Sequence, residues 1–223
     1  MNYEQTLSIE KINNHKLYDQ AFLHKSAVTE ENPISNERLE FIGDSVLGLV
    51  VAQHLYEKYP QENEGFLTKI RTKIVSGKSL SKIAKSLNFD QFIKMNEKGL
   101  RNEWNKNPRL LEDALEAIIG AIYLDQGLEC SRNFVKTNII ETFNDDFLLE
   151  DTNYKDILMR FLQGRKNPTL PEYKLYKDNY TVNKLFIIHI YINGKFVSEG
   201  MHKNKKEAEQ RAAKRSLQCF NII

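Results

Sequence analysis

Three acidic residues, Glu37, Glu40 and Asp44, form a narrow stripe along a segment that the sequence predicts to be helical. At 100° per residue they lie at 0°, about −60° and about −20° around the helix axis. Apolar residues cover nearly all the rest of this helix, so we expect it to be buried. Buried carboxylates are costly, and three together repel one another unless cations neutralise them. The stripe therefore predicts a metal site.

A second apolar segment carries a similar acidic pair, Asp113 and Glu116, at i, i+3 spacing. Two helices can therefore offer facing pairs of carboxylates. Ligation by oxygen alone favours a hard cation, and open positions for water and phosphate oxygens suit Mg²⁺ or Mn²⁺ better than Ca²⁺. The matching chemistry is metal-assisted hydrolysis of a phosphodiester bond. The alternative is that these acids form solvated helix faces or ion pairs, as most acids at this spacing do.

Helical apolar spacing predicts the elements that carry these acids, over residues 37–58, 65–87, 109–124 and 130–143. Pro33 with Ser35 or Asn36 is suited to start the first helix, and Pro60 to end it. No stretch before residue 150 shows sustained period-two alternation. We expect an all-α domain of seven or eight helices.

The pattern changes after residue 152. The sequence predicts a helix, three strands and a final helix, over residues 154–162, 172–177, 185–192, 195–199 and 205–220. Asn193-Gly194 predicts a type I′ hairpin between the last two strands. This α-β-β-β-α order indicates a small α+β domain in which two helices back an antiparallel sheet.

The two parts carry opposite charge. Residues 1–152 contain 18 Lys and Arg against 24 Asp and Glu, a net charge of −6, whereas residues 153–223 contain 14 against 6, a net charge of +8. Lys203, Lys205 and Lys206 gather where the final helix begins, so the positive end of its dipole adds to their charge. A duplex phosphate backbone is the natural ligand. We expect domains over 1–146 and 153–223, joined by a linker over 147–152.

Composition excludes several classes of protein. With 41% hydrophobic and 28% charged residues, the chain is typical of a globular protein. Its longest charge-free apolar window, residues 45–56, is shorter than the roughly 20 residues of a membrane span, and its start has no signal-peptide pattern. We expect no membrane partner and a cytoplasmic location. Cys130 and Cys219 lie far apart without metal-ligand spacing, so we expect free thiols.

Residues 36–47, NERLEFIGDSVL, resemble the signature of the ribonuclease III family nearly residue for residue. Later family motifs are resembled, in the right order, by Glu64-Gly65 before a helix with Lys69 and Arg71, by residues 111–117 (LEDALEA) and by residues 119–125 (IGAIYLD). The resemblance covers essentially the entire chain. It implies a homodimeric endoribonuclease that cuts double-stranded RNA and leaves 5′-phosphate and 3′-hydroxyl ends with short 3′ overhangs.

The resemblance also implies roles for single residues. The metal-binding set that activates a water is Glu40, Asp44, Asp113 and Glu116, with Mg²⁺ as the metal and Mn²⁺ able to substitute. Glu37 and Glu64 are implied as auxiliary catalytic acids, and Phe41 as a residue that enters a socket on the partner subunit. The alternative is a non-catalytic double-stranded RNA-binding protein that keeps the fold. Because all six acids are present, the sequence favours the enzyme.

Residues 205–213, KKEAEQRAA, resemble the double-stranded RNA-binding domain, as does the order of elements around them. Recognition of that kind depends on A-form shape, 2′-hydroxyls and phosphates more than on base sequence. Two departures affect the expected RNA contacts. Met159 stands where bacterial relatives usually carry Gln, which makes Gln163 the nearer polar candidate. The loop 177–184 lacks the usual Gly-Pro-x-His element and offers Tyr180 as a candidate instead.

Overall fold

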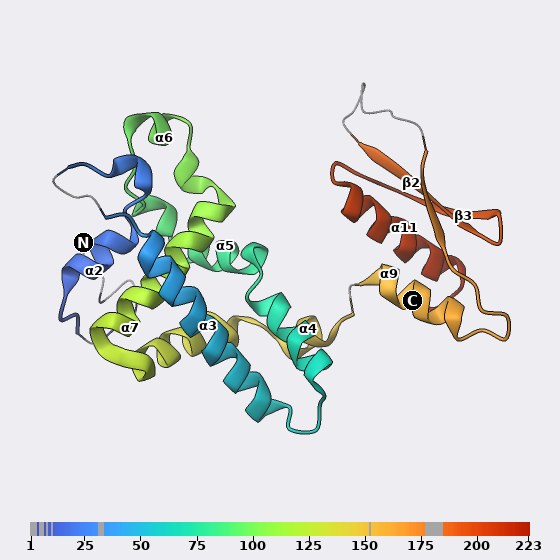
Figure 1. Cartoon of the computed structure of the whole chain (residues 1–223), viewed down its shortest axis with the longest axis horizontal. Coiled ribbons are helices and arrows are strands. Elements are labelled where there is room, and N and C mark those ends of the chain that lie inside the picture. Colours follow the sequence, from blue (N-terminus) through green and yellow to red (C-terminus); the bar gives the residue numbers. More distant parts are fainter. Residues whose placement is uncertain are drawn as a thin grey trace. The chain divides into compact units, whose positions relative to one another are not determined.

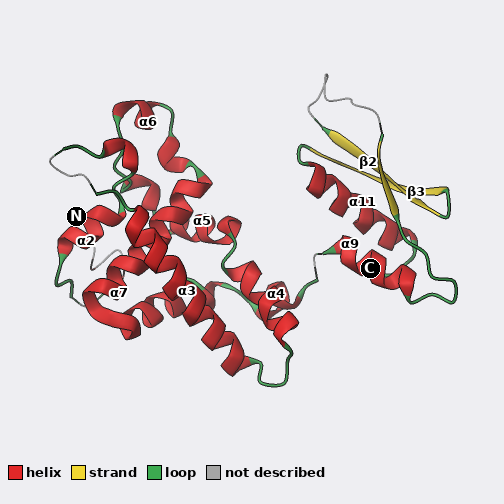
Figure 2. Cartoon of the chain, in the orientation of Figure 1, coloured by secondary structure: helices red, strands yellow, loops and turns green. Residues whose placement is uncertain are grey.

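The computed structural model describes Glu4, Leu7, Ile9 and residues 11–30, 34–151, 153–176 and 185–223. The chain divides into two compact units, Met1–Leu149 and Glu150–Ile223. The first unit is helical, and the second has the order helix, three strands, helix (Figure 2). The predicted fold class is therefore confirmed. None of the described helices is both long and apolar enough to cross a membrane.

The first unit contains seven α-helices within the described residues: α2 (His15–Ala21), α3 (Glu37–Lys58), α4 (Glu64–Ile74), α5 (Gly77–Ser86), α6 (Glu97–Arg101), α7 (Pro108–Asn138) and α8 (Asp145–Leu149). Short 3-10 turns connect them: η1 (Lys25–Ala27), η2 (Phe89–Gln91), η3 (Trp104–Lys106) and η4 (Ile140–Thr142). The ends of α3 follow its flanking residues. Asn36 occupies the N-cap position, although its side chain makes no capping hydrogen bond, and the helix stops at Lys58, two residues before Pro60. Pro33 lies outside the described residues.

Two of the predicted helices differ in the structure. The single helix expected over 65–87 is two helices, because the Ser76 hydroxyl accepts a hydrogen bond from the backbone N–H of Ser79 and starts α5. The segments expected over 109–124 and 130–143 are two arms of α7, which breaks at Gly127 (φ 83°). The second arm ends at Asn138 and a 3-10 turn follows it.

Helices α3 and α7 cross at the centre of the first unit (Figure 1). A Cβ on Gly43 would overlap the backbone carbonyl of Glu116, and a Cβ on Gly120 would overlap that of Leu39. The two glycines therefore permit an approach that larger residues would prevent. The crossing lies beside the acids of both helices, so it sets how close the two acidic pairs come.

The structure corrects the expectation that the helix 37–58 is buried nearly all round. One face of α3 packs into the core through residues such as Leu47, Val51 and Leu55. The face that includes Phe41 and Tyr56, which are 77% and 72% exposed, is open in the single chain. Apolar side chains on an exposed helix face mark a surface available to a partner.

The second unit is built from α9 (Tyr154–Gln163), β1 (Glu172–Leu175), β2 (Phe186–Ile192), β3 (Lys195–His202) and α11 (Lys205–Cys219). The strands pair antiparallel in the order β1-β2-β3. Asn193 and Gly194 have φ values of 51° and 74°, as a type I′ turn requires. The helices and sheet share one core, formed by Leu158, Leu162, Ile188, Ile190, Ile192, Ala208, Ala212, Ala213 and Leu217.

The predicted linker, residues 147–152, is not wholly a connection. The short helix α8 occupies its first half, and Leu148 is buried in the core of the first unit. The contacts of the first unit therefore extend to Leu149, three residues beyond the predicted domain end at 146.

Candidate active site and nucleic-acid interface

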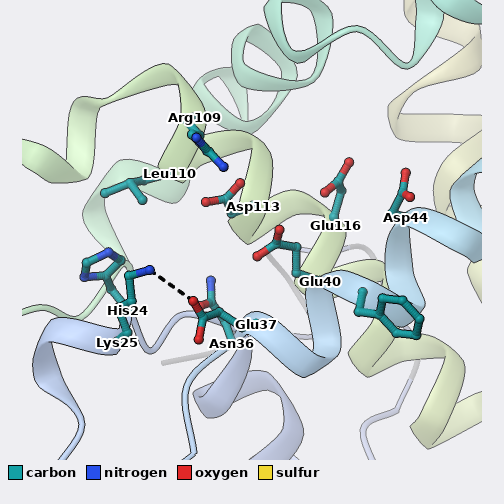
Figure 3. A pocket seen from close by; sticks show the side chains of 11 residues that line it. His24, Lys25, Asn36, Glu37, Glu40, Asp44, Arg109, Leu110, Asp113 and Glu116 are labelled. Atoms are coloured by element: carbon teal, nitrogen blue, oxygen red, sulfur yellow. Dashed lines mark hydrogen bonds and ion pairs between the residues drawn. The ribbon is translucent and has the colours of Figure 1, made fainter.

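A pocket of about 670 Å³ lies between α3 and α7 and contains the four acids predicted to hold a metal. Glu40 and Asp44 come from α3, and Asp113 and Glu116 come from α7. The i, i+4 and i, i+3 spacings place each pair on one helix face. Figure 3 shows the side chains directed into the same space. The structure therefore brings together residues that are about 70 positions apart in the sequence.

Burial raises the pKa values of three of these acids, Glu40, Asp113 and Glu116. The pKa of Glu116 is raised to about 8, first by burial and then by the charges of Asp44 and Glu112, ahead of those of Glu40 and Asp113. The pKa values of Glu40 and Asp113 are also raised, mainly by burial. Raised pKa values of this kind mean that too little positive charge lies near the carboxylates to neutralise them.

Three cationic or titratable side chains line the same pocket and were not singled out by the sequence: His24, Lys25 and Arg109. The Arg109 charge opposes the rise in the pKa of both Glu40 and Asp113. Its i, i+4 spacing to Asp113 is a signal that could have identified it. His24 and Lys25 precede the acidic stripe by more than ten residues, and no local pattern links them to it.

The two predicted auxiliary acids lie in different places. Glu37 lines the pocket and accepts a hydrogen bond from the Lys25 ammonium at 3.1 Å, which lowers its pKa (Figure 3). Glu64 is the exposed first residue of α4, where its carboxylate accepts a hydrogen bond from the Thr68 hydroxyl at 2.8 Å. Glu64 comes after the C-terminal end of α3, a helix about 33 Å long, and it does not line the pocket.

The donor set of the pocket fits a hard divalent cation. All four predicted ligands offer oxygen, and the raised pKa values show the charge deficit that a cation would correct. Among the described residues, no group of three or more acids, histidines or cysteines lies close enough together to hold a metal ion by itself. Mg²⁺ keeps several waters and needs only one or two protein carboxylates, so an open pocket with separated acids suits it.

The start of α11 presents the predicted lysines to solvent. Lys203, Lys205 and Lys206 are all exposed. The Asn204 side chain caps the helix by accepting hydrogen bonds from the backbone N–H groups of Lys206 and Glu207 at 2.8 and 3.4 Å. Exposed ammonium groups at the positive end of a 15-residue helix have the charge that favours contact with an anion.

A groove of about 480 Å³ between α9 and α11 joins this surface to the first helix of the unit. Met159 and Lys206 both line the groove. Gln163, the last residue of α9, is exposed but does not line it. Tyr180 lies outside the described residues.

Comparisons with known proteins agree with both units. The family model described as Ribonuclease-III-like matches residues 14–143, and the double-stranded RNA binding motif matches residues 154–218. Ribonuclease 3 of Borreliella afzelii is 39% identical over 227 residues, which cover 98% of this chain and 90% of that protein. Ribonuclease 3 of Bacillus licheniformis is 38% identical over 219 residues, covering 96% and 87%.

A solved structure matches the first unit. The nuclease domain of ribonuclease III from Campylobacter jejuni is 42% identical, with a TM-score of 0.59, and the match covers 63% of this chain and 95% of that one. The fold and its site thus define a nuclease domain followed by a double-stranded RNA-binding domain. The chain belongs to the ribonuclease III family, and it is a ribonuclease III-type endoribonuclease.

Proposed function

We propose that this protein cleaves double-stranded RNA by divalent-metal-assisted hydrolysis of phosphodiester bonds, in RNA processing or in degradation of duplex RNA. The products are 5′-phosphate and 3′-hydroxyl ends with short 3′ overhangs. The observation that carries the proposal is the meeting of Glu40, Asp44, Asp113 and Glu116 in one pocket, with raised pKa values for three of them. A cytoplasmic location stays a prediction from the sequence.

Within this proposal, the four acids hold Mg²⁺, with Mn²⁺ able to substitute. The bound metal would supply activation of water and neutralisation of the phosphate charge. The cationic groups of Lys25 and Arg109, at the same pocket, attract the RNA phosphate and orient it toward the acids. Lys25 also holds Glu37 by its ion pair, so Glu37 is positioned as an auxiliary acid. Glu64 acts as an auxiliary acid from outside the pocket of its own chain.

The open face of α3 supports a homodimer. Phe41, Leu49 and Tyr56 are 77%, 54% and 72% exposed. At 100° per residue they fall within about 80° of one another around the axis of α3, so they share one side of the helix. Gly48 lies on the same helix with open space where a Cβ would be, which would allow a second helix to approach closely. The Campylobacter jejuni nuclease domain is described as having a region involved in dimer formation. We infer that Phe41 enters the partner subunit across this face.

The second unit holds the substrate. Lys203, Lys205 and Lys206 bind phosphates of the duplex, and the helix dipole of α11 adds to their attraction. Met159 occupies the groove beside Lys206, so an apolar side chain meets the RNA there, and Gln163 supplies a polar contact at the end of α9. Contacts of this kind favour recognition of duplex shape over base sequence. Tyr180 remains a candidate from its sequence position alone.

The test is cleavage of a long perfect RNA duplex by the full chain, with Mg²⁺ present or chelated. We expect cleavage only with metal, and a loss of about 10³-fold or more for Glu116→Gln, with duplex affinity within about twofold. Glu141→Gln, an exposed acid outside the pocket, is the matched control and should cleave normally. If the wild type binds duplex tightly but never cleaves it with Mg²⁺ or Mn²⁺, the protein is a non-catalytic RNA-binding relative.

A further inference from the structure

The second unit has a further basic surface, which lies along the later turns of α11. A groove of about 540 Å³ lies between β3 and α11, and we name it the outer groove. Its cationic or titratable lining residues are His202, Lys203, Arg211, Lys214 and Arg215. No carboxylate of the described residues lines it, although Arg215 has an ion-pair partner nearby in Glu199, at 3.9 Å. Leu185 and Met201 add an apolar part to its wall.

The arginines of this groove are held in place by the edge of the sheet. β3 is an edge strand, so its outward carbonyl groups have no strand partner within the described sheet. The Arg211 guanidinium donates to the Met201 carbonyl at 3.1 Å, and the Arg215 guanidinium donates to the Glu199 carbonyl at 3.0 Å. Because a guanidinium has five N–H donors, most remain available to a ligand. The positions of both cations are therefore fixed before any ligand arrives.

Lys214 is also oriented without being neutralised. Its ammonium lies over the Tyr154 ring, 4.9 Å from the ring centroid, and the side chain is exposed. Among the described residues, no carboxylate forms an ion pair with Lys214. Fixed guanidinium groups beside a free ammonium suit a run of phosphate groups, since Arg binds phosphate through paired N–H donors and Lys binds it as a point charge.

The outer groove shares Lys203 with the lysines that begin α11 but not Lys205 or Lys206, and it extends along the helix beyond them. Lys205 and Lys206 lie in the first turn, whereas Lys214 follows nine positions later, about 13 Å further along the axis. The residues Arg211, Lys214 and Arg215 also alternate with the buried residues that face the sheet, so they point outward from the core. Arg211, Lys214 and Arg215 therefore lie outside the first turn that carries Lys205 and Lys206.

We propose that the outer groove binds the phosphate backbone of a second RNA segment, in addition to the duplex held at the start of α11. This inference rests on the proposed function, because it extends the same RNA-binding unit. The shared chemistry is a run of phosphodiester groups. These phosphodiester groups belong either to a single-stranded flank of the bound RNA or to a second duplex, and the experiment distinguishes these two ligands.

The experiment uses the full chain with a chelator present, so that the RNA stays intact. Binding is measured by titration calorimetry with a blunt duplex of about 20 base pairs and with the same duplex carrying a single-stranded tail of about 12 nucleotides. The test variant is Arg211→Gln with Lys214→Gln, since glutamine keeps an amide donor for the Met201 carbonyl. The control variant, Lys166→Gln with Lys195→Gln, removes two exposed charges elsewhere in the unit.

We expect the groove variant to lose about three- to tenfold in affinity for the tailed duplex, with a salt dependence reduced by about one phosphate contact, if the ligand is a flank. If the ligand is a second duplex, the variant should bind fewer blunt duplexes per chain than the wild type. The control should stay within about twofold. Equal behaviour of the two variants on both RNAs would overturn the inference.

These outcomes are distinguishable from failure of the proposed function. Wild-type protein that neither binds nor cleaves the blunt duplex contradicts the proposed function itself. Wild-type protein that cleaves it with Mg²⁺, while the groove variant matches the control, contradicts only the outer-groove inference.

Discussion

The acid pocket of the first unit and the lysine cluster of the second both gather like charges, but they accommodate them differently. Three of the pocket carboxylates, those of Glu40, Asp113 and Glu116, are partly buried between two helices, so their pKa values rise. The ammonium groups of Lys205 and Lys206 are exposed at the start of one helix, where water solvates them. The first arrangement depends on how two remote segments meet, and the second depends on a local run of sequence. Variants should therefore affect them in different ways.

The largest expected effect is on the helix crossing that builds the pocket. Gly43→Ala should lower the free energy of unfolding by about 3 kcal/mol, because the new Cβ would overlap the Glu116 carbonyl. Gly65→Ala, in the first turn of α4, where a Cβ would meet only the Asn63 side chain at 3.4 Å, should be neutral or raise it by about 0.5–1 kcal/mol. Both are measured by urea unfolding. Equal effects of the two variants would show that close helix approach does not define the pocket.

The lysine cluster should tolerate substitution without loss of stability. Lys205→Ala with Lys206→Ala should weaken duplex binding by about 10- to 100-fold and reduce the salt dependence by about two phosphate contacts. Fluorescence anisotropy at several salt concentrations measures this. The melting temperature should change little, since both side chains are exposed. Unchanged affinity would mean that the duplex binds elsewhere on the protein.

A third prediction concerns the open face of α3 beside the pocket. Phe41→Ala should weaken the dimer by about tenfold or more, because an exposed aromatic anchor is lost from the interface. Analytical ultracentrifugation over a concentration series measures the dissociation constant. Phe196→Ala, a 53% exposed aromatic of the second unit, is the control. A wild-type chain that is monomeric at every concentration contradicts the proposed dimer.

The smallest effect is a pH-dependent difference in stability. In the folded state the pKa of Glu116 is about 8, above its ordinary value near 4.5, so between these values the folded state binds more protons than the unfolded state. The free energy of unfolding therefore falls as pH rises through this window, because the unfolded chain releases a proton that the folded chain still holds on Glu116. Without divalent metal, Glu116→Gln should melt at nearly the wild-type temperature at pH 5 and about 2–4 °C above it at pH 8.5. A gap that is constant with pH would contradict the burial of this charge.

Much of the fold follows from local patterns. Helical spacing predicted the all-α class of the first unit, and together with the Asn193-Gly194 turn it predicted the element order of the second, because periodicity and turn chemistry act over a few residues. The break at Ser76 was missed, since apolar spacing continues through it while a serine cap restarts the helix. Apolar spacing did not predict the open face of α3 either, and only the family resemblance implied that Phe41 lies at a subunit interface. Apolar residues that face a core and those that face a partner have the same spacing.

The sequence by itself determined the chemistry: which carboxylates exist, how each pair lies on its helix, and which lysines begin α11. Helical geometry fixes these relations over three or four residues. Only the tertiary structure decided which acids share a pocket, that Lys25 and Arg109 join them, and that Glu64 lies outside it. Distance and burial between remote segments set the pKa values, and these quantities exist only once α3 and α7 have packed together.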